Sequence, residues 1–267
     1  MDELLAEVIA GVQKTPKYHS LNTEVITRVA QQEIQIHRNH KETIHQVRSR
    51  LHQISSAFFP DKTRIEAWSA QLAVLPPEIH HPTAINFCRQ ILTEHHSTAE
   101  RLPFVEDFYA QLAGLFSESS RILDLGCGLN SLSYCWFPQK KISCYEAVDI
   151  HADLAVFLNL YFSHFQIPGQ AVNHDVFTYR GTGNYDIAFL LKLIPVLEHQ
   201  NKKELIPWLA SIPASNLVIS YPIRSLGGRN KGMQAQYSGK FHGLAAELNW
   251  HYREISFPNE IVYIVDR

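Results

Sequence analysis

The sequence feature most suggestive of ligand binding is a short apolar segment that runs directly into two closely spaced glycines. Ile122, Leu123 and Leu125 predict a buried strand, and Gly126 and Gly128 follow it at once. A glycine turn at the carboxyl end of a parallel strand lets a ligand approach the backbone closely. The segment therefore predicts a binding site, although an ordinary strand, turn and helix could carry the same two glycines.

An acidic residue, Asp124, lies at the end of this strand. The strict G-x-G-x-x-G pattern of dinucleotide-binding folds is absent, because position 131, where its last glycine would be, is Ser131. The string Asp124-Leu-Gly-Cys-Gly resembles motif I of class I methyltransferases. Their ligand, S-adenosylmethionine, carries no pyrophosphate. The resemblance implies that Asp124, Gly126, Cys127 and Gly128 belong to a binding site for that cofactor.

Two further carboxylates follow predicted strands at spacings that suit a nucleoside. Asp149 ends the apolar segment 142–149 and lies 25 residues after Asp124, close to the distance of about 20 residues expected for an acid after the second strand. An ionised carboxylate there can accept both ribose hydroxyls. Asp175 ends segment 171–176 and is positioned to accept from an adenine amino group. The alternative for Asp149 is an N-cap of the helix predicted over 154–165.

Positioning these side chains requires a parallel sheet, which the alternation of apolar segments predicts. Strands are predicted at 122–125, 142–149, 171–176, 185–192 and 216–221, with helices at 132–136, 154–165 and 198–209. The fourth strand is almost wholly apolar, as a buried parallel strand should be. Segments 254–256 and 261–265 can form the reversed hairpin that ends class I sheets. We therefore predict an α/β fold, a class I (Rossmann-like) S-adenosylmethionine-dependent methyltransferase sheet.

The first hundred residues show helical periodicity and no strand alternation. Asn22 can cap a helix that starts near Thr23, and Ser97 or Thr98 can cap one that runs from about 104 to 116. We predict a helical N-terminal subdomain over 1–103, followed by the methyltransferase domain over 104–267. Arg101, close to the glycine turn in sequence, is a candidate cofactor contact; its alternative is a surface ion pair with Glu100 or Glu106.

One predicted helix, from Ile36 to Phe58, has an apolar stripe opposite a cationic one. The cationic stripe comprises Arg38, Lys41, His45, Arg48 and His52. Between residues 14 and 64 there are nine Lys or Arg against four Asp or Glu, in a chain whose formal charge is −2. A solvated helix face and a phosphate-binding face are both open interpretations.

A second cationic segment follows the fifth predicted strand. Residues 221–246 contain no Asp or Glu, but they include five glycines together with Arg224, Arg229, Lys231 and Lys240. A glycine-rich basic loop at the carboxyl end of a sheet suits a mobile lid that meets a polyanionic substrate.

Other classes of protein find little support. The four cysteines form no C-x-x-C pair and the 15 histidines no ligand pattern, so we predict no metal site. We see no signal peptide and no apolar run of the ~18 residues that a membrane helix needs. These features predict a cytoplasmic protein without a membrane partner, and we expect a monomer.

Four strings carry a more specific resemblance: His95-His-Ser-Thr-Ala-Glu-Arg-Leu-Pro, Asp124-Leu-Gly-Cys-Gly-Leu-Asn-Ser, Leu190-Leu-Lys-Leu-Ile-Pro and Tyr221-Pro-Ile-Arg-Ser-Leu-Gly-Gly-Arg-Asn-Lys-Gly-Met. Together they resemble the aminoglycoside-resistance methyltransferases that modify N7 of guanine 1405 in 16S rRNA, over nearly the whole chain. That family often has alanine where this chain has Gly126. The resemblance implies S-adenosylmethionine as cofactor, the 30S subunit as substrate and a docking role for the helical extension.

The candidate residues fall into three groups. Candidate cofactor contacts are Arg101, Asp124, Gly126, Cys127, Gly128, Asp149, Ile150, Asp175, Val176 and Leu191. Candidate RNA contacts are Arg38, Lys41, Arg48, Arg224, Arg229 and Lys231. Lys192 and Tyr221 are candidate catalytic residues that act by positioning, because guanine N7 has a free lone pair and needs no general base.

The target guanine would have to be flipped out, and Tyr221 is a candidate stacking partner. One alternative is a small-molecule methyltransferase that uses the helical segment as a lid. Another is a degenerate fold that only binds RNA, against which the presence of Asp124, Gly126, Gly128 and Asp149 argues.

Overall fold

A seven-stranded sheet lies at the centre of the part of the chain that the structure describes. The structure is a computed structural model, described here for residues 2–37, 39–55, 65–138, 142–223 and 233–267. The strands are β1 (Ser120–Leu125), β2 (Ile142–Asp149), β3 (Gly169–Asn173), β4 (Tyr185–Leu191), β5 (Ala214–Pro222), β6 (His251–Ser256) and β7 (Glu260–Asp266), in the order β3-β2-β1-β4-β5-β7-β6. β1 to β5 are parallel, whereas β7 is antiparallel to both neighbours. The predicted class I sheet with its reversed hairpin is confirmed.

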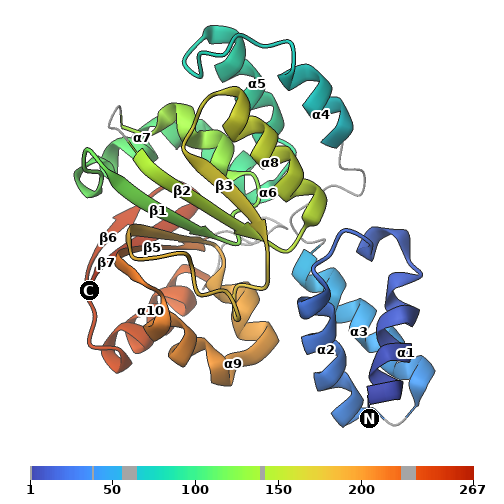
Figure 1. The fold of residues 1–267 in the computed structure, drawn as a ribbon. Helices are drawn as coiled ribbons and strands as arrows, with labels where there is room; N and C mark the ends of the chain where they lie inside the picture. The colour runs from blue at the N-terminus through green and yellow to red at the C-terminus, as the bar shows by residue number, and fades with distance from the viewer. Residues whose placement is uncertain (1, 38, 56–64, 139–141, 224–232) are drawn as a thin grey trace.

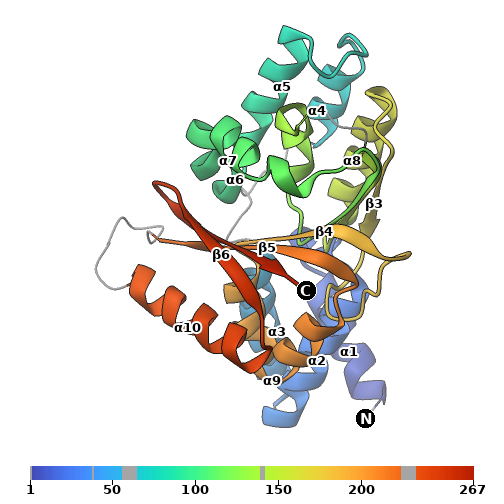
Figure 2. The same cartoon turned by 90° about the vertical axis from the view of Figure 1, so that its left-hand side faces the viewer.

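Helices cover both faces of this sheet (Figure 2). On one face lie α4 (Ile65–Leu72), α5 (Pro82–Leu92), α6 (His96–Arg101), α7 (Val105–Gln111) and α8 (Ala152–His164); on the other lie α9 (Ile194–Ser211) and α10 (Met233–Glu247). Alternate residues of β4 point to opposite faces: Phe189 packs in the core with α7 and α8, and Leu190 in the core with α9 and α10. Burial on both faces explains why β4 is apolar except at Asp186, which is half-buried.

The first three helices form a separate bundle (Figure 1). They are α1 (Asp2–Gln13), α2 (Thr23–Ile36) and α3 (His40–Ser55), and their shared core includes Val8, Val29, Val47 and Leu51. α4 and α5 contribute instead to the core that contains sheet residues. The division at residue 103 therefore remains a proposal, and core packing favours an earlier one, between α3 and α4.

Some local predictions are wrong in their boundaries. The helix predicted from Ile36 is two helices, because α2 ends at Ile36, whose side chain is 65% exposed, and Asn39 accepts hydrogen bonds from the first amides of α3. Ser97 and Thr98 cap no helix, since both lie inside α6, which begins after His95. Segment 132–136 is part of a 3₁₀ helix (Asn130–Trp136). The second half of the predicted lid is α10, and residues 224–232 lie outside the described part of the chain.

The N-terminal end of α2 is fastened to the carboxyl ends of two strands. Asn22 caps α2 as predicted, accepting from the amides of Glu24 and Val25. Its side chain also donates to the carbonyl of Asn173 at 3.1 Å, and its own amide donates to the carbonyl of Ile150 at 2.8 Å. These contacts fix the helical bundle at the edge of the sheet where a ligand is expected.

Asn22→Ala removes a helix cap together with a contact between bundle and sheet, whereas Asn39→Ala removes only a cap. A cap contributes about 1 kcal/mol and a hydrogen bond about 1 kcal/mol more. In urea denaturation, we expect the free energy of unfolding to fall by about 1 kcal/mol for Asn39→Ala and by about 2 kcal/mol for Asn22→Ala. Equal losses would show that the contact with Asn173 contributes little.

Candidate cofactor site

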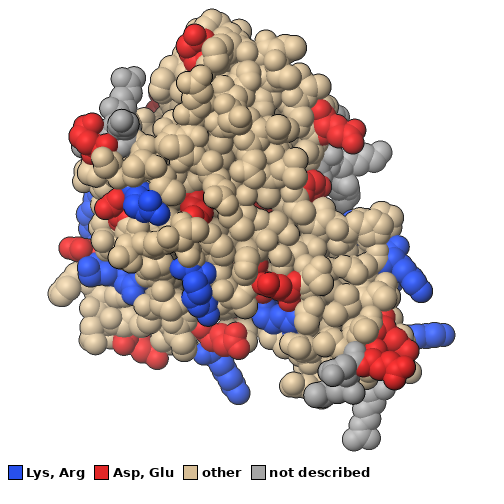
Figure 3. All heavy atoms as spheres, in the orientation of Figure 1, with Lys and Arg blue, Asp and Glu red and all other residues tan. Residues whose placement is uncertain are grey.

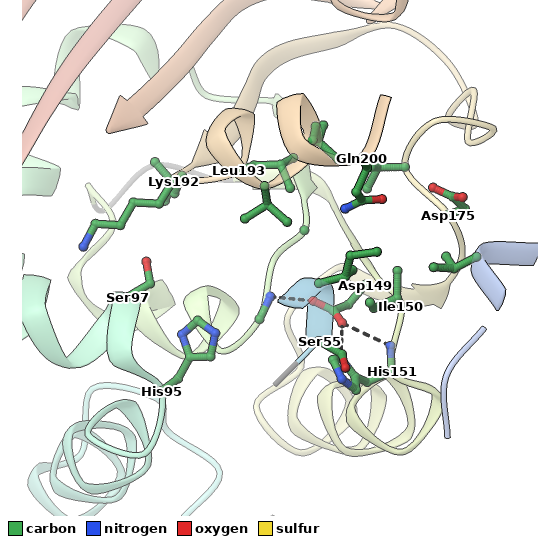
Figure 4. A pocket seen from close by; sticks show the side chains of 18 of the residues that line it. Ser55, His95, Ser97, Asp149, Ile150, His151, Asp175, Lys192, Leu193 and Gln200 are labelled. Carbon is green, nitrogen blue, oxygen red and sulfur yellow. Dashed lines mark hydrogen bonds and ion pairs between the residues drawn. The ribbon is translucent and has the colours of Figure 1, made fainter. Parts of the chain in front are cut away.

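A cleft whose empty space, including the part open to solvent, is about 720 Å³ lies where β1, β2 and β4 end, beside the N-terminal half of α2. Figure 4 shows Asp149 near its middle, Asp175 and Gln200 at one end, and Lys192 and Ser97 at the other. The predicted residues that line it are Gly126, Gly128, Asp149, Ile150, Asp175, Val176, Leu191 and Lys192. Lining residues that the sequence did not predict as site residues include Val25, Arg28, His95, Ser97, His151 and Gln200.

The glycine turn forms one wall of the cleft. Gly126 and Gly128 have φ angles of +61° and +49°, in the left-handed region that favours glycine. A Cβ atom on Gly128 would lie 3.0 Å from Nε2 of His95, so this position also lacks room for a side chain. The amide of Gly128 donates to Asp149 at 2.9 Å, which holds the turn against β2.

Asp149 presents an ionised carboxylate in the cleft. One oxygen accepts from the Gly128 amide; the other accepts from the amide of His151 at 3.1 Å and lies 2.8 Å from its Nδ1. Burial alone would raise the pKa of Asp149, but these hydrogen bonds and the charge of His151 hold that pKa below its usual value. The alternative role as a helix N-cap is not what the structure shows, because His151 occupies the N-cap position of α8.

Asp124 lies behind the glycine turn and is not one of the residues that line the cleft. It is buried and accepts from the hydroxyl of Tyr145 at 2.6 Å and from the side-chain amide of Asn130 at 3.0 Å. Burial raises the pKa of Asp124 to about 6 despite these hydrogen bonds. Its contacts indicate a role in fixing the turn, and direct binding of a cofactor stays a prediction.

Arg101 is also buried behind the turn. Its guanidinium makes two hydrogen bonds with Glu260, at 2.5 and 3.0 Å, and donates to Asn130 at 3.3 Å. Its side chain is 2% exposed, so the alternative of a surface ion pair with Glu100 or Glu106 is wrong. Arg101 reaches Asp124 through Asn130, which joins α6, β1 and β7 in one polar network.

Of the two predicted catalytic residues, Lys192 lines the cleft, whereas Tyr221 is not among the residues that line it. Lys192 has a φ angle of +57°, and its ammonium group donates to Glu100 at 2.5 Å. Tyr221 is 0% exposed and packs among Tyr237, Phe241 and Tyr263. Burial raises the pKa of the Tyr221 hydroxyl. A stacked base would reach this ring only after rearrangement around α10, so stacking on Tyr221 remains an untested prediction.

The predicted RNA contacts fall into three situations. Lys41 is exposed on α3, whereas Arg48 is half-buried and donates to the carbonyl of Gly11 at 2.6 Å. Arg38, Arg224, Arg229 and Lys231 lie outside the described residues. On the face in Figure 3, Lys and Arg side chains alternate with Asp and Glu. Among the described members of the cationic stripe, Lys41 is therefore solvated and Arg48 is partly packed.

Among the described residues, no group of three or more His, Cys, Asp or Glu side chains is arranged to hold a metal ion. None of their helices combines the length and the apolar character needed to span a bilayer.

The residues missed by sequence reasoning differ in how much signal they carried. His95 and Ser97 lie within a string that supports the resemblance, and His151 follows Asp149 by two positions. Arg28 carried no signal, because its partner Asp175 is 147 residues away. Only the fold brings these two side chains together.

His95→Gln should change how stability depends on pH. Burial lowers the pKa of His95 to about 3, with Asp149 opposing and Arg101, His151 and His96 reinforcing the shift. Because the folded pKa lies below the unfolded one of about 6.5, protonation favours the unfolded chain, and stability is lost as pH falls through 6.5.

In denaturation curves between pH 7 and 5, the wild type should lose about 2 kcal/mol relative to His95→Gln. The matched control His96→Gln changes an exposed neighbour and should follow the wild type. A pH dependence in His95→Gln as steep as in the wild type would contradict this assignment.

Comparison with known proteins identifies the family of this chain. The family described as ribosomal RNA methyltransferase (FmrO) matches residues 14–264. A 16S rRNA (guanine(1405)-N(7))-methyltransferase of Frankia casuarinae is 28% identical over all of this chain and 95% of its own length. One of the same name from Serratia marcescens is 27% identical over 98% of both chains.

Solved structures agree over the same extent. The 16S rRNA methyltransferase RmtF, in complex with S-adenosyl-L-homocysteine, has a TM-score of 0.85 and 27% identity, with 100% of this chain and 99% of RmtF covered. The 16S rRNA methylase RmtB shares the fold, with a TM-score of 0.80 and 23% identity over 98% of both chains. The chain therefore belongs to the FmrO family of ribosomal RNA methyltransferases.

Proposed function

We propose that this chain transfers a methyl group from S-adenosylmethionine to N7 of guanine 1405 in 16S rRNA. The observation that carries the proposal is that relatives named for this activity align with the chain from end to end, including the helical bundle. This extent favours rRNA over the alternative of a small-molecule acceptor, which the family membership does not support.

The cleft has the features that this cofactor requires. Its glycine turn leaves the backbone open to a ligand, and Asp149 offers an ionised carboxylate for the ribose hydroxyls. When bound, S-adenosylmethionine supplies an electrophilic methyl group on a sulfonium. We assign cofactor contacts first to Gly126, Gly128 and Asp149, because these residues line the cleft. Arg101, Asp124 and Cys127 are not among the lining residues, and we assign them a role in supporting the glycine turn.

The reaction asks the protein to position groups rather than to move protons. Guanine N7 carries a lone pair and no proton, so in-line placement against the methyl group and exclusion of water suffice. We assign positioning roles to Lys192 and Tyr221. The Lys192 ammonium is held by Glu100, and its backbone amide donates to Ser220 at the end of β5. A fixed strand end of this kind limits where an acceptor base can lie.

The proposed activity also implies a substrate, a cellular location and an oligomeric state. The substrate would be the 30S subunit in the cytoplasm, the enzyme would act as a monomer, and the modified subunit would resist aminoglycosides that bind the decoding site. The exposed cations of the bundle would contact rRNA phosphates.

The test is incubation of the purified chain with tritiated S-adenosylmethionine and either intact 30S subunits or naked 16S rRNA, followed by base mapping. We expect label in the 30S subunit at N7 of guanine 1405, detected by chain cleavage at 7-methylguanine. Asp149→Ala is the negative control, because it removes the proposed ribose acceptor. Label at another base, or none in either substrate while the cofactor still binds, would contradict the proposal.

Lys41→Glu should weaken binding to the 30S subunit if the bundle contacts phosphates. Reversing one phosphate-contacting charge should weaken binding several-fold and reduce the salt slope by about 1. The measurement is the dissociation constant from 50 to 200 mM salt. Lys203→Glu, on an exposed turn of α9, is the matched control and should bind as the wild type does. Identical salt slopes for both variants would assign the Lys41 face to solvent.

A further inference from the structure

One residue of the helical bundle reaches into the cofactor cleft. Arg28, on α2, donates through Nε to the carboxylate of Asp175 at 2.6 Å and through Nη2 to the side chain of Gln200 at 2.8 Å. Its guanidinium lies 4.9 Å from the centre of the Phe177 ring. These three partners lie in the segment after β3 and on α9, so Arg28 of α2 is held by parts of the chain outside the bundle.

The contacts of Arg28 change what this end of the cleft offers a ligand. Sequence reasoning assigned Asp175 as the acceptor for an adenine amino group. In the structure one oxygen of Asp175 accepts from Arg28 and the other from the amide of Phe177 at 3.1 Å, and the side chain is 2% exposed. The carboxylate is thus largely covered, and the guanidinium lies over it.

One donor of this guanidinium has no acceptor among the described residues. Nη1 of Arg28 is buried and makes no hydrogen bond there, although the residue lines the cleft. A buried donor without an acceptor is costly, and such groups are few in folded proteins. An acceptor supplied by a bound ligand would remove this cost.

We propose that Arg28 is a cofactor-binding residue contributed by the helical bundle, and that its Nη1 donates to a ring nitrogen of adenine. The inference rests on the proposed S-adenosylmethionine site. In Figure 4 Asp175 and Gln200, the two partners of Arg28, lie at the end of the cleft beyond the ribose acceptor Asp149, where the adenine of a nucleoside would be. The contacts of Asn22 with Asn173 and Ile150 keep α2 in register with this end.

Calorimetric titration with S-adenosylhomocysteine tests the proposal on the full-length chain. Arg28→Met keeps an unbranched apolar stem and removes the donors. We expect this variant to bind S-adenosylhomocysteine at least about tenfold more weakly than the wild type, because it loses a charge-assisted hydrogen bond. Arg50→Met is the matched control: Arg50 also projects from the bundle, pairs with Glu33 at 2.9 Å and is not a residue of the cleft lining. Its binding should stay within about twofold of the wild type.

A second set of ligands separates a direct contact from a general disturbance of Asp175. Analogues of S-adenosylhomocysteine with N1, N3 or N7 of adenine replaced by CH each lack one acceptor. For the contacted nitrogen, the wild type should lose about tenfold in affinity and Arg28→Met much less. A purely structural role would weaken the variant's binding of all ligands by the same factor, and that result would overturn the proposal.

The remaining outcomes are also decisive. Unchanged affinity in Arg28→Met would remove Arg28 from the site. Tighter binding would mean that Arg28 competes with adenine for Asp175, which also contradicts the proposal. If the wild type failed to bind S-adenosylhomocysteine, the cofactor assignment in the proposed function would fail instead, whatever the variants did.

Discussion

The hydrogen bond from the Gly128 amide to Asp149 is the interaction on which the rest of the site depends. It joins the turn after β1 to the end of β2, and it helps keep a buried carboxylate ionised against the cost of desolvation. The turn can take this course because two glycines adopt left-handed φ angles. The hydrogen bond also requires the parallel sheet, since the sheet places the carboxyl ends of β1 and β2 side by side.

Behind the turn, buried charges are organised in a chain of hydrogen bonds. Glu260 pairs with Arg101, Arg101 donates to Asn130, and Asn130 donates to Asp124. A buried ion pair contributes little net stability, yet breaking one partner away leaves an uncompensated charge. The network therefore ties the reversed hairpin and α6 to the glycine turn, and it makes the position of each element depend on the others.

The sequence predicted the parts of the molecule that local chemistry determines. The bounds of β2 and the cap at Asn22 were correct, because apolar strands and helix caps are properties of neighbouring residues. Asp149 was found because the spacing between consecutive strands is a property of the fold class. The continuous helix from Ile36 was wrong because Asn39 competes for the backbone amides that the helix would have used.

Tertiary contacts account for what the sequence did not reveal. Arg48 shares its spacing with Lys41, but only the packing of α3 on α1 shows that its guanidinium reaches the Gly11 carbonyl. Arg28 and Asp175 meet across the junction of bundle and sheet, and no periodicity connects them. Glu260 carried no site prediction, because its role as the partner of Arg101 depends on the register of β7 beside β5.

The anchoring of α2 also has a consequence for the order in which the chain becomes structured during synthesis. Asn22 and its partner Asn173 are separated by 151 residues. At about 5 to 20 residues per second, roughly 8 to 30 s pass between the synthesis of the two. During that time the bundle can form its own core, but its seat on the sheet does not yet exist. The bundle therefore lacks its contact with Asn173 until β3 has been made, and the cleft, whose lining extends to Gln200, cannot be complete before that part of α9 has been made.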